Sequence, residues 1–264
     1  MIELGGITKI YSRGFFRRQK TVAVNNVTLS IKKGEALGLV GESGSGKSTL
    51  GRIALRLIEP TSGTVRFDGT DLMHLSRKDL RKFRPRMQIL FQDPDTALNP
   101  RMTIRQCVAE PLAIWNPAGK EETDDRIAGL LELVGLSPDL IDRYPFEISG
   151  GQKQRVALAR VLSLNPSFVV ADEPTAALDL SVQAQVLGLI KSLQKRTNLT
   201  LLFISHDLQI IEQMSDTVAV MHRGSIVEHG TMRALLYNPQ DIYTQRLVTA
   251  AKECEVGSGK HSQN

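Results

Sequence analysis

The sequence predicts an α/β fold: a core of mostly parallel sheet flanked by helices, an N-terminal antiparallel β-subdomain and an inserted α-helical subdomain. Three observations predict it. The first third of the chain alternates between apolar and polar residues, or is continuously apolar, as strands are. A glycine-rich segment follows a buried-strand pattern and precedes a helical one. Helical patterns punctuated by prolines fill a segment at about 100–164, after which alternating strand and helix patterns continue.

The elements of the first third follow from hydrophobic spacing. Val22–Ile31 alternates, which is typical of a half-buried strand, and Ala36–Gly41 is continuously apolar, which is typical of a buried parallel strand. Asp68-Gly69 is a turn dipeptide, so a short edge strand is expected just before it. The expected elements are strands at Val22–Ile31, Ala36–Gly41, Gly63–Gly69 and Met87–Phe91, and a helix at Lys47–Leu57.

The rest of the chain is predicted to be mixed. Helices are expected at Thr103–Leu112, Glu121–Val134, Pro138–Tyr144, Gly150–Leu164, Ser181–Arg196 and Asp207–Met214. Strands are expected at Phe168–Ala171, Leu199–Ile204, Thr217–Met221 and Ser225–Glu228, the last two forming a hairpin across Arg223-Gly224. Residues 1–251 are expected to form one domain, and the polar segment 252–264 a disordered tail.

Composition restricts the possible classes of protein. The 264 residues are 41% hydrophobic and 23% charged, so a sizeable core is expected. The net charge of +5 suits a protein that binds polyanionic phosphate. Two widely spaced cysteines argue against a disulfide scaffold or zinc site. No apolar run approaches the ~20 residues of a membrane span, and no signal-peptide core is present, so a cytoplasmic chain is expected, peripheral if it serves a membrane.

The stretch GESGSGKST has the spacing of a phosphate-binding P-loop. Its glycines let backbone N–H groups turn toward a phosphate chain, and the helix that follows adds the positive end of its dipole. Lys47 would contact the β and γ phosphates, and Ser48 would ligate Mg²⁺. A simple glycine turn is the weaker alternative, because strand, loop and helix occur in the required order. The candidate nucleotide-binding residues are Gly41, Glu42, Ser43, Gly44, Ser45, Gly46, Lys47, Ser48 and Thr49, in a P-loop NTPase core.

The stretch FVVADEPT ends an apolar run with two carboxylates. A buried strand that ends in Asp172 can place that carboxylate near Mg²⁺, as in a Walker B motif. Glu173, one residue further, can orient or deprotonate a water that attacks the γ phosphate. An acidic turn after a strand is the alternative, and it is weak beside the P-loop.

A second anion site is predicted at the start of the Gly150–Leu164 helix. The residues are Ser149, a good helix cap, followed by Gly150, Gly151 and Gln152. One nucleotide does not need two separate phosphate cradles in one chain. The second cradle is therefore interpreted as gripping a phosphate held by another subunit's P-loop.

With these motifs the sequence resembles the ATPase subunits of ABC transporters, over nearly the whole chain. In that family Ser-Gly-Gly-Gln is the signature motif, bound across a dimer. The resemblance implies that Tyr11 stacks on adenine, Gln92 senses Mg²⁺ and couples to the membrane subunit, Asp179 reaches across the dimer, and His206 contacts the γ phosphate. Taken singly, Gln92 or His206 would be an ordinary polar residue, and their coincidence with the other motifs favours the family roles.

Two departures from the family pattern occur. Ile148 replaces the leucine that usually begins the signature, a nearly volume-conserving change. Ala176 replaces the serine that usually begins the segment leading to Asp179, so one inter-subunit hydrogen bond is in question. Neither change removes a catalytic group, and a hydrolytically competent site is expected.

The peptide/nickel import branch is the subfamily that the sequence resembles, through Phe91–Thr103, Asn238–Gln245 and the insertion Arg13–Lys20. That branch usually pairs two different ATPase subunits under two membrane subunits, which work with an extracytoplasmic substrate-binding protein. The branch's usual His-Pro is replaced by Asp241-Ile242, within the stretch Asn238–Thr244. Cys254 alone cannot hold the iron–sulfur cluster that many members carry, so none is expected.

The resemblance implies ATP-driven import at the cytoplasmic face of the membrane, with ATP and Mg²⁺ as cofactors and no nucleic acid partner. Export or lipoprotein extraction is the first alternative. A soluble ABC-type ATPase in DNA repair or translation is the second, although no long coiled-coil pattern or tandem ATPase domain is present. A small-molecule kinase is the third, and it leaves Gln92, the signature and His206 unexplained. Basic residues at Arg13–Lys20 and Arg77–Arg86 are interpreted as a solvated loop and a charged helix face.

Overall fold

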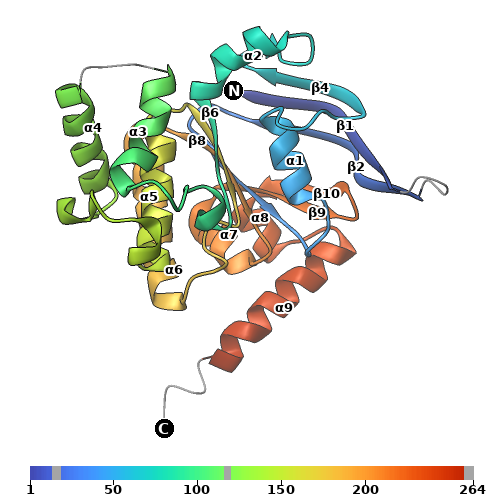
Figure 1. The fold of residues 1–264 in the computed structure, drawn as a ribbon. Coiled ribbons are helices and arrows are strands. Elements are labelled where there is room, and N and C mark those ends of the chain that lie inside the picture. The colour runs from blue at the N-terminus through green and yellow to red at the C-terminus, as the bar shows by residue number, and fades with distance from the viewer. Residues whose placement is uncertain (14–18, 116–119, 259–264) are drawn as a thin grey trace. The chain divides into compact units, whose positions relative to one another are not determined.

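The computed structural model describes residues 1–13, 19–115 and 120–258, and it divides the chain into two compact units (Figure 1). Unit 1 consists of Met1–Ser76 and Thr200–Asn264, and unit 2 is Arg77–Leu199. The expected basic loop within Arg13–Lys20 falls largely on residues 14–18, which lie outside the described residues.

An antiparallel sheet forms the first part of unit 1, as predicted. Its strands are β1 (Ile2–Arg13), β2 (Gln19–Ile31), β4 (Ser62–Phe67) and β5 (Thr70–Asp71), in the order β2-β1-β4-β5. Positive φ angles at Asp68 and Gly69 close the turn between β4 and β5. The prediction of an edge strand at Gly63–Gly69 is wrong, because β4 pairs on both sides and the two-residue β5 takes the edge.

The second sheet region of unit 1 is mostly parallel. β3 (Ala36–Val40) lies between β8 (Thr200–Ser205) and β9 (Thr217–His222), and it is parallel to both. β10 (Ser225–Thr231) pairs antiparallel with β9, across a turn with positive φ at Arg223 and Gly224. Every residue of β3 and β8 is buried, which explains why β3 is continuously apolar and why β8 is apolar between Thr200 and Ser205.

In the described part of unit 1 the helices are α1 (Lys47–Ala54), α7 (Leu208–Met214), α8 (Met232–Tyr237) and α9 (Ile242–Ser258). α1 ends three residues before the predicted Leu57, since Arg56 has a left-handed backbone. α9 extends through Ser258, so it includes the first seven residues of the segment 252–264 that the sequence predicts to be a disordered tail. Residues 259–264 lie outside the described residues.

Unit 2 combines a parallel pair of strands with a group of helices. β6 (Met87–Leu90) pairs with β7 (Phe168–Asp172). The helices are α2 (Arg77–Phe83), α3 (Ile104–Trp115), α4 (Lys120–Leu133), α5 (Gly150–Leu162) and α6 (Leu180–Thr197). α5 packs against α3, α4 and α6, and α3 and α4 lie beside it in Figure 1.

One predicted helix is absent from the described part of unit 2. Pro138–Tyr144 forms only a one-turn 3-10 helix at Pro138–Leu140, and a second such turn follows at Pro145–Glu147. Tyr144 is extended (φ −93°, ψ 156°), as expected for a residue that precedes proline. Pro145 therefore keeps the end of this stretch out of the helical conformation, and the turn that begins at Pro138 ends at Leu140.

Candidate nucleotide-binding site

The loop Gly41–Thr49 connects β3 to α1 and is shaped by close backbone approaches. A Cβ atom added to Gly41 would lie closer than 3.0 Å to Met221 O. One added to Gly46 would lie equally close to Ala23 O, and Gly46 also has a φ of 110°. Both positions require glycine, because any side chain would push the loop away from its neighbouring strands.

Lys47 is buried inside this loop, with only 4% of its surface exposed. Its Nζ donates hydrogen bonds to Gly41 O over 2.6 Å and to Glu42 O over 2.9 Å. Lys47 is also the first residue of α1, so its charge adds to the positive end of the helix dipole. Among the described residues, Ser45 Oγ is buried without a hydrogen-bond partner. The loop thus concentrates positive potential and an unsatisfied hydroxyl, which suits an anionic phosphate chain.

Strand register brings His206 to the same sheet edge as the loop. Val40 of β3 pairs with Ser205 of β8 in parallel, so Gly41 and His206 directly follow paired residues. His206 is exposed and precedes Asp207, the capping residue of α7. Tyr11 lies on β1, opposite Thr21 of β2, with 43% of its surface exposed. Unit 1 therefore carries Tyr11, the loop and His206.

Unit 2 carries the acidic residues at the carboxyl ends of its paired strands. β7 is buried throughout and ends in Asp172, which is 6% exposed. Leu90 of β6 pairs with Ala171 of β7, so Gln92 follows β6 at the edge where Asp172 and Glu173 follow β7. Gln92 is exposed and Glu173 is half-buried. Glu173 has a left-handed backbone (φ 48°), an unfavourable conformation for a residue with a side chain and one that also occurs at active sites.

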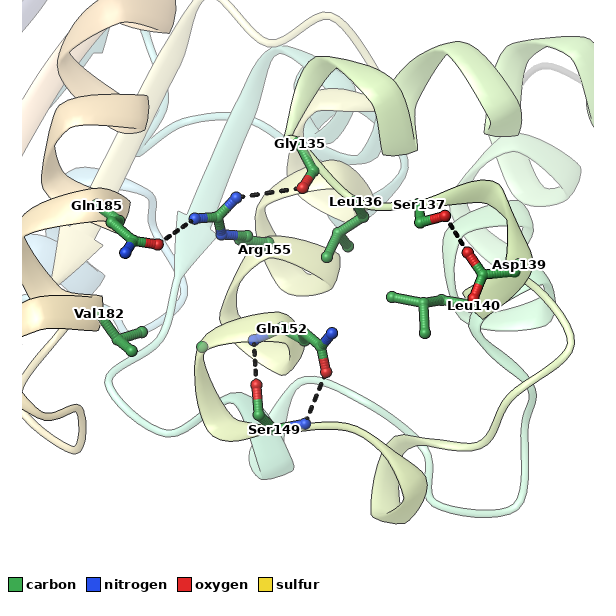
Figure 2. Close-up of a pocket in the computed structure, with 11 residues that line it drawn as sticks. Gly135, Leu136, Ser137, Asp139, Leu140, Ser149, Gln152, Arg155, Val182 and Gln185 are labelled. Atoms are coloured by element: carbon green, nitrogen blue, oxygen red, sulfur yellow. Dashed lines mark hydrogen bonds between the residues drawn. The ribbon is translucent and has the colours of Figure 1, made fainter.

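The signature residues form a closed capping box at the start of α5. Ser149 Oγ accepts a hydrogen bond from Gln152 N over 3.3 Å, and Gln152 Oε1 accepts one from Ser149 N over 2.9 Å (Figure 2). These residues line a cavity of about 400 Å³ within unit 2, together with Arg155, Val182 and Gln185. The cavity opens beside the start of α5, where the sequence predicts an anion site.

Three residues that follow the signature connect α5 to its surroundings, and sequence reasoning assigned them no role. Lys153 Nζ lies 2.7 Å from Asp95 Oδ1. Gln154 is buried, and its amide donates to Phe91 O over 3.4 Å. The only sequence signal is the run Lys153-Gln154-Arg155 directly after the signature. Both contacts attach α5 to residues on either side of Gln92.

Arg155 joins the ends of two other helices to α5. Its guanidinium donates to Val134 O and Gly135 O, over 3.2 and 3.3 Å, just beyond the end of α4. It also donates to Gln185 Oε1 of α6 over 3.0 Å (Figure 2). Asp179 caps α6 by accepting from Val182 N over 3.0 Å. Its side chain thus has a local structural role in this chain.

No group of three or more His, Cys, Asp or Glu side chains is placed to hold a metal ion in the described ranges. In the same ranges, no helix has the length and apolar character that a membrane span requires.

Comparisons with known proteins agree with this geometry. The ABC transporter family model matches residues 24–176. A putative peptide import ATP-binding protein of Brucella ovis is 48% identical over 251 residues, covering 95% of this chain and 78% of the relative. The putative oligopeptide transport ATP-binding protein YkfD of Bacillus subtilis is 49% identical over 235 residues, covering 88% and 71%.

Solved structures are similar over most of the chain. A dimeric, post-hydrolysis structure of the ATP-binding cassette MJ0796 with ADP and phosphate has a TM-score of 0.80 and 32% identity, covering 88% of this chain and 99% of that one. The structure of cbiO1 from Clostridium perfringens, part of an ABC transporter complex, has a TM-score of 0.80 and 30% identity, covering 96% and 98%. The P-loop geometry, the family match and these relatives lead to one conclusion: the chain belongs to the ABC transporter family and has its α/β ATPase fold.

Proposed function

We propose that this chain is the ATP-binding subunit of an importer that takes up peptides through separate membrane subunits. The observation that carries the proposal is the buried Lys47 in a loop where Gly41 and Gly46 leave no space for a side chain. Relatives named for peptide import, which cover most of this chain, favour peptides over nickel as the cargo.

In this proposal Lys47 and the backbone of Gly41–Thr49 hold the phosphates, and Tyr11 stacks on the adenine. Ser48, Gln92 and Asp172 hold Mg²⁺, because hydroxyl, amide and carboxylate oxygens are the donors that this ion prefers. When bound, the ion neutralises charge on the β and γ phosphates. The buried Ser45 hydroxyl, which has no hydrogen-bond partner among the described residues, fits an oxygen atom of a phosphate.

Glu173 is the proposed general base. Its carboxylate takes a proton from the attacking water, and its left-handed backbone fixes the direction from which the side chain leaves β7. His206 contacts the γ phosphate from the edge of β8. Glu173 and His206 thus act on the attacking water and the γ phosphate, while the loop Gly41–Thr49 binds the nucleotide.

Two such subunits are proposed to close around ATP, with Ser149, Gly150, Gly151 and Gln152 of each facing the partner's loop and Asp179 at the same interface. The similarity to a dimeric cassette supports this arrangement. A pair of two different ATPase subunits is favoured, as in the branch that the sequence resembles. The complex would include two membrane permeases and an extracytoplasmic binding protein, with this chain at the cytoplasmic face.

The test is purification of this chain from solubilised native membranes, with partners identified by mass. A second ATPase subunit, two membrane subunits and a peptide-binding protein are expected. Peptide uptake by the reconstituted complex must then require ATP hydrolysis. Recovery with nucleic acid or ribosomes, or DNA-stimulated hydrolysis, would support the soluble repair or translation alternative and reject import. Recovery of this chain with the membrane subunits of an export or lipoprotein-release system would reject the proposal of import.

A further inference from the structure

The first turn of α9 contacts the phosphate-binding loop. The backbone N–H of Glu42 donates a hydrogen bond to Tyr243 Oη over 3.0 Å, although the two residues are 201 positions apart. Glu42 is the second residue of the loop Gly41–Thr49, and Tyr243 is the second residue of α9. The functions proposed above give Tyr243 no role.

The ring of Tyr243 is held in place by stacking. Its centroid lies 4.0 Å from that of His222, with 29° between the planes. His222 is the last residue of β9, and the preceding residue, Met221, provides the carbonyl that approaches Gly41. Burial raises the pKa of the Tyr243 phenol above its ordinary value, so the hydroxyl stays neutral at physiological pH.

The backbone of Tyr243 is fixed by two carboxylates. Asp241 Oδ1 accepts hydrogen bonds from Tyr243 N over 2.8 Å and from Thr244 N over 3.3 Å. The Glu228 carboxylate on β10 accepts from Gln240 N and Asp241 N, both over 3.0 Å. Tyr243 is therefore held both by its stacked ring and by the hydrogen bonds at the first turn of α9, so it can serve as a fixed point for the loop.

The loop side of the contact is equally well connected. Glu42 O accepts from Ser45 N over 3.1 Å and from Lys47 Nζ over 2.9 Å. Gly224 N, in the turn between β9 and β10, donates to Ser45 O over 2.9 Å. Two contacts from the last part of the chain thus hold the loop at Glu42 and Ser45. A loop that is already in shape loses less conformational entropy when a ligand binds.

We propose that Tyr243 is a positioning residue for the phosphate-binding loop, and that its hydroxyl, by holding the Glu42 N–H, keeps the loop ready for the nucleotide. This inference rests on the proposed nucleotide role of Gly41–Thr49. Tyr243 acts through the loop backbone and does not touch the phosphates. Its loss should therefore weaken nucleotide binding and leave the chemical step unchanged.

The experiment uses the full chain and the substitution Tyr243→Phe, which keeps the stacked ring and removes the hydroxyl. Kd is measured with a fluorescent ATP analogue, and KM and kcat with ATP. One lost hydrogen bond predicts that Kd and KM rise about three- to ten-fold, with kcat at saturating ATP within about two-fold of the wild type. The matched control is Tyr237→Phe, which removes a hydroxyl from a 79% exposed ring on α8 and should leave Kd unchanged.

Urea unfolding without nucleotide separates this role from a purely structural one. A structural role would lower the unfolding midpoint of Tyr243→Phe and leave Kd unchanged well below that midpoint, which would overturn the proposal. A fall in kcat with unchanged KM would also overturn it. His222→Leu removes the imidazole ring that stacks on Tyr243 and keeps the Tyr243 hydroxyl. This variant should also have a higher Kd, and an unchanged Kd would contradict the claim that His222 holds Tyr243 in place. If the wild type itself does not bind the ATP analogue, the nucleotide function fails first, and the inference fails with it.

Discussion

Gly151 of α5 lies directly against Val182 of α6: a Cβ atom on Gly151 would fall closer than 3.0 Å to Val182 Cγ1. The glycine that the sequence assigns to phosphate binding therefore also sets how closely α5 and α6 pack. Val182 N is the group that Asp179 caps, so this contact lies at the first turn of α6.

Gly151→Ala is expected to destabilise the chain by about 1–3 kcal/mol, the usual cost of overpacking a close contact. Gly150→Ala is the matched control, since its Cβ would lie 3.5 Å from Leu178 Cδ2, an ordinary contact distance. Urea unfolding of both variants tests this. Equal midpoints would show that α6 moves away from Gly151 at no cost.

Gly129 and Gly188 are helix-interior glycines with open space around them. A Cβ atom at either position meets nothing within 4 Å. Because alanine restricts the unfolded backbone and suits a helix better, each change to alanine should stabilise the chain by up to about 1 kcal/mol. Thermal unfolding should show a higher midpoint for both, and a lower midpoint would show that the added methyl group is not accommodated at these helix positions.

Arg155→Lys should be costly although it preserves the charge. A lysine cannot reach Val134 O, Gly135 O and Gln185 Oε1 together, because these acceptors need the guanidinium fork. The expected loss is about 2 kcal/mol in the free energy of unfolding. Arg196→Lys, at an exposed position in the last turn of α6, serves as the control and should change little. Indistinguishable effects of the two changes would argue against the network.

Glu173→Gln should lower the ATPase kcat by about 10²–10⁴-fold, the usual contribution of a general base. The variant should be as stable as the wild type, because glutamate and glutamine have nearly the same shape and would adopt the same left-handed backbone at position 173. Size-exclusion chromatography with ATP should show the variant trapped as a closed dimer. Turnover at the wild-type rate would mean that another group activates the water.

Cys107 makes the free energy of unfolding depend on pH in the alkaline range. Burial raises the pKa of this thiol above its ordinary value of about 9. Its contribution to stability is complete below pH 9 and is lost as pH rises toward the folded-state pKa, because the unfolded chain deprotonates first. In a Cys254→Ser background, the free energy of unfolding should fall more steeply between pH 8 and pH 10.5 than in the Cys107→Ala form of that background. Equal slopes would contradict the shift.

Much of the fold was accessible from the sequence, because its central strands are apolar over most of their length. β3 and β7 are continuously buried and are followed directly by the loop and by Glu173, so pattern and motif coincide there. α9 was missed for a physical reason: the buried positions described on it include Thr244, so its apolar periodicity is weak. The apolar spacing of Pro138–Tyr144 favours a helix, but Pro145 holds Tyr144 in an extended conformation, and spacing alone does not show this.

The local parts of the candidate site were accessible in the same way, and the supporting contacts were not. Ser149, Asp179 and the loop are contiguous motifs. The bonds from Arg155 to Val134 and from Tyr243 to Glu42 join residues 21 and 201 positions apart. Such pairs follow from how elements pack, which hydrophobic spacing does not specify.

Unit 1 is built from two segments of the chain that are far apart in sequence, and this affects the chain while it is synthesised on the ribosome. β3 is made early, yet both strands that flank it, β8 and β9, lie after residue 199. The loop Gly41–Thr49 leaves the exit tunnel long before Gly224 and Tyr243, which hold its backbone. The nascent chain therefore carries this loop unsupported while all of unit 2 is translated, and an apolar β3 waits without partners. A truncated product that ends before residue 200 would expose that strand, and chaperone capture or degradation is the expected fate of such a product.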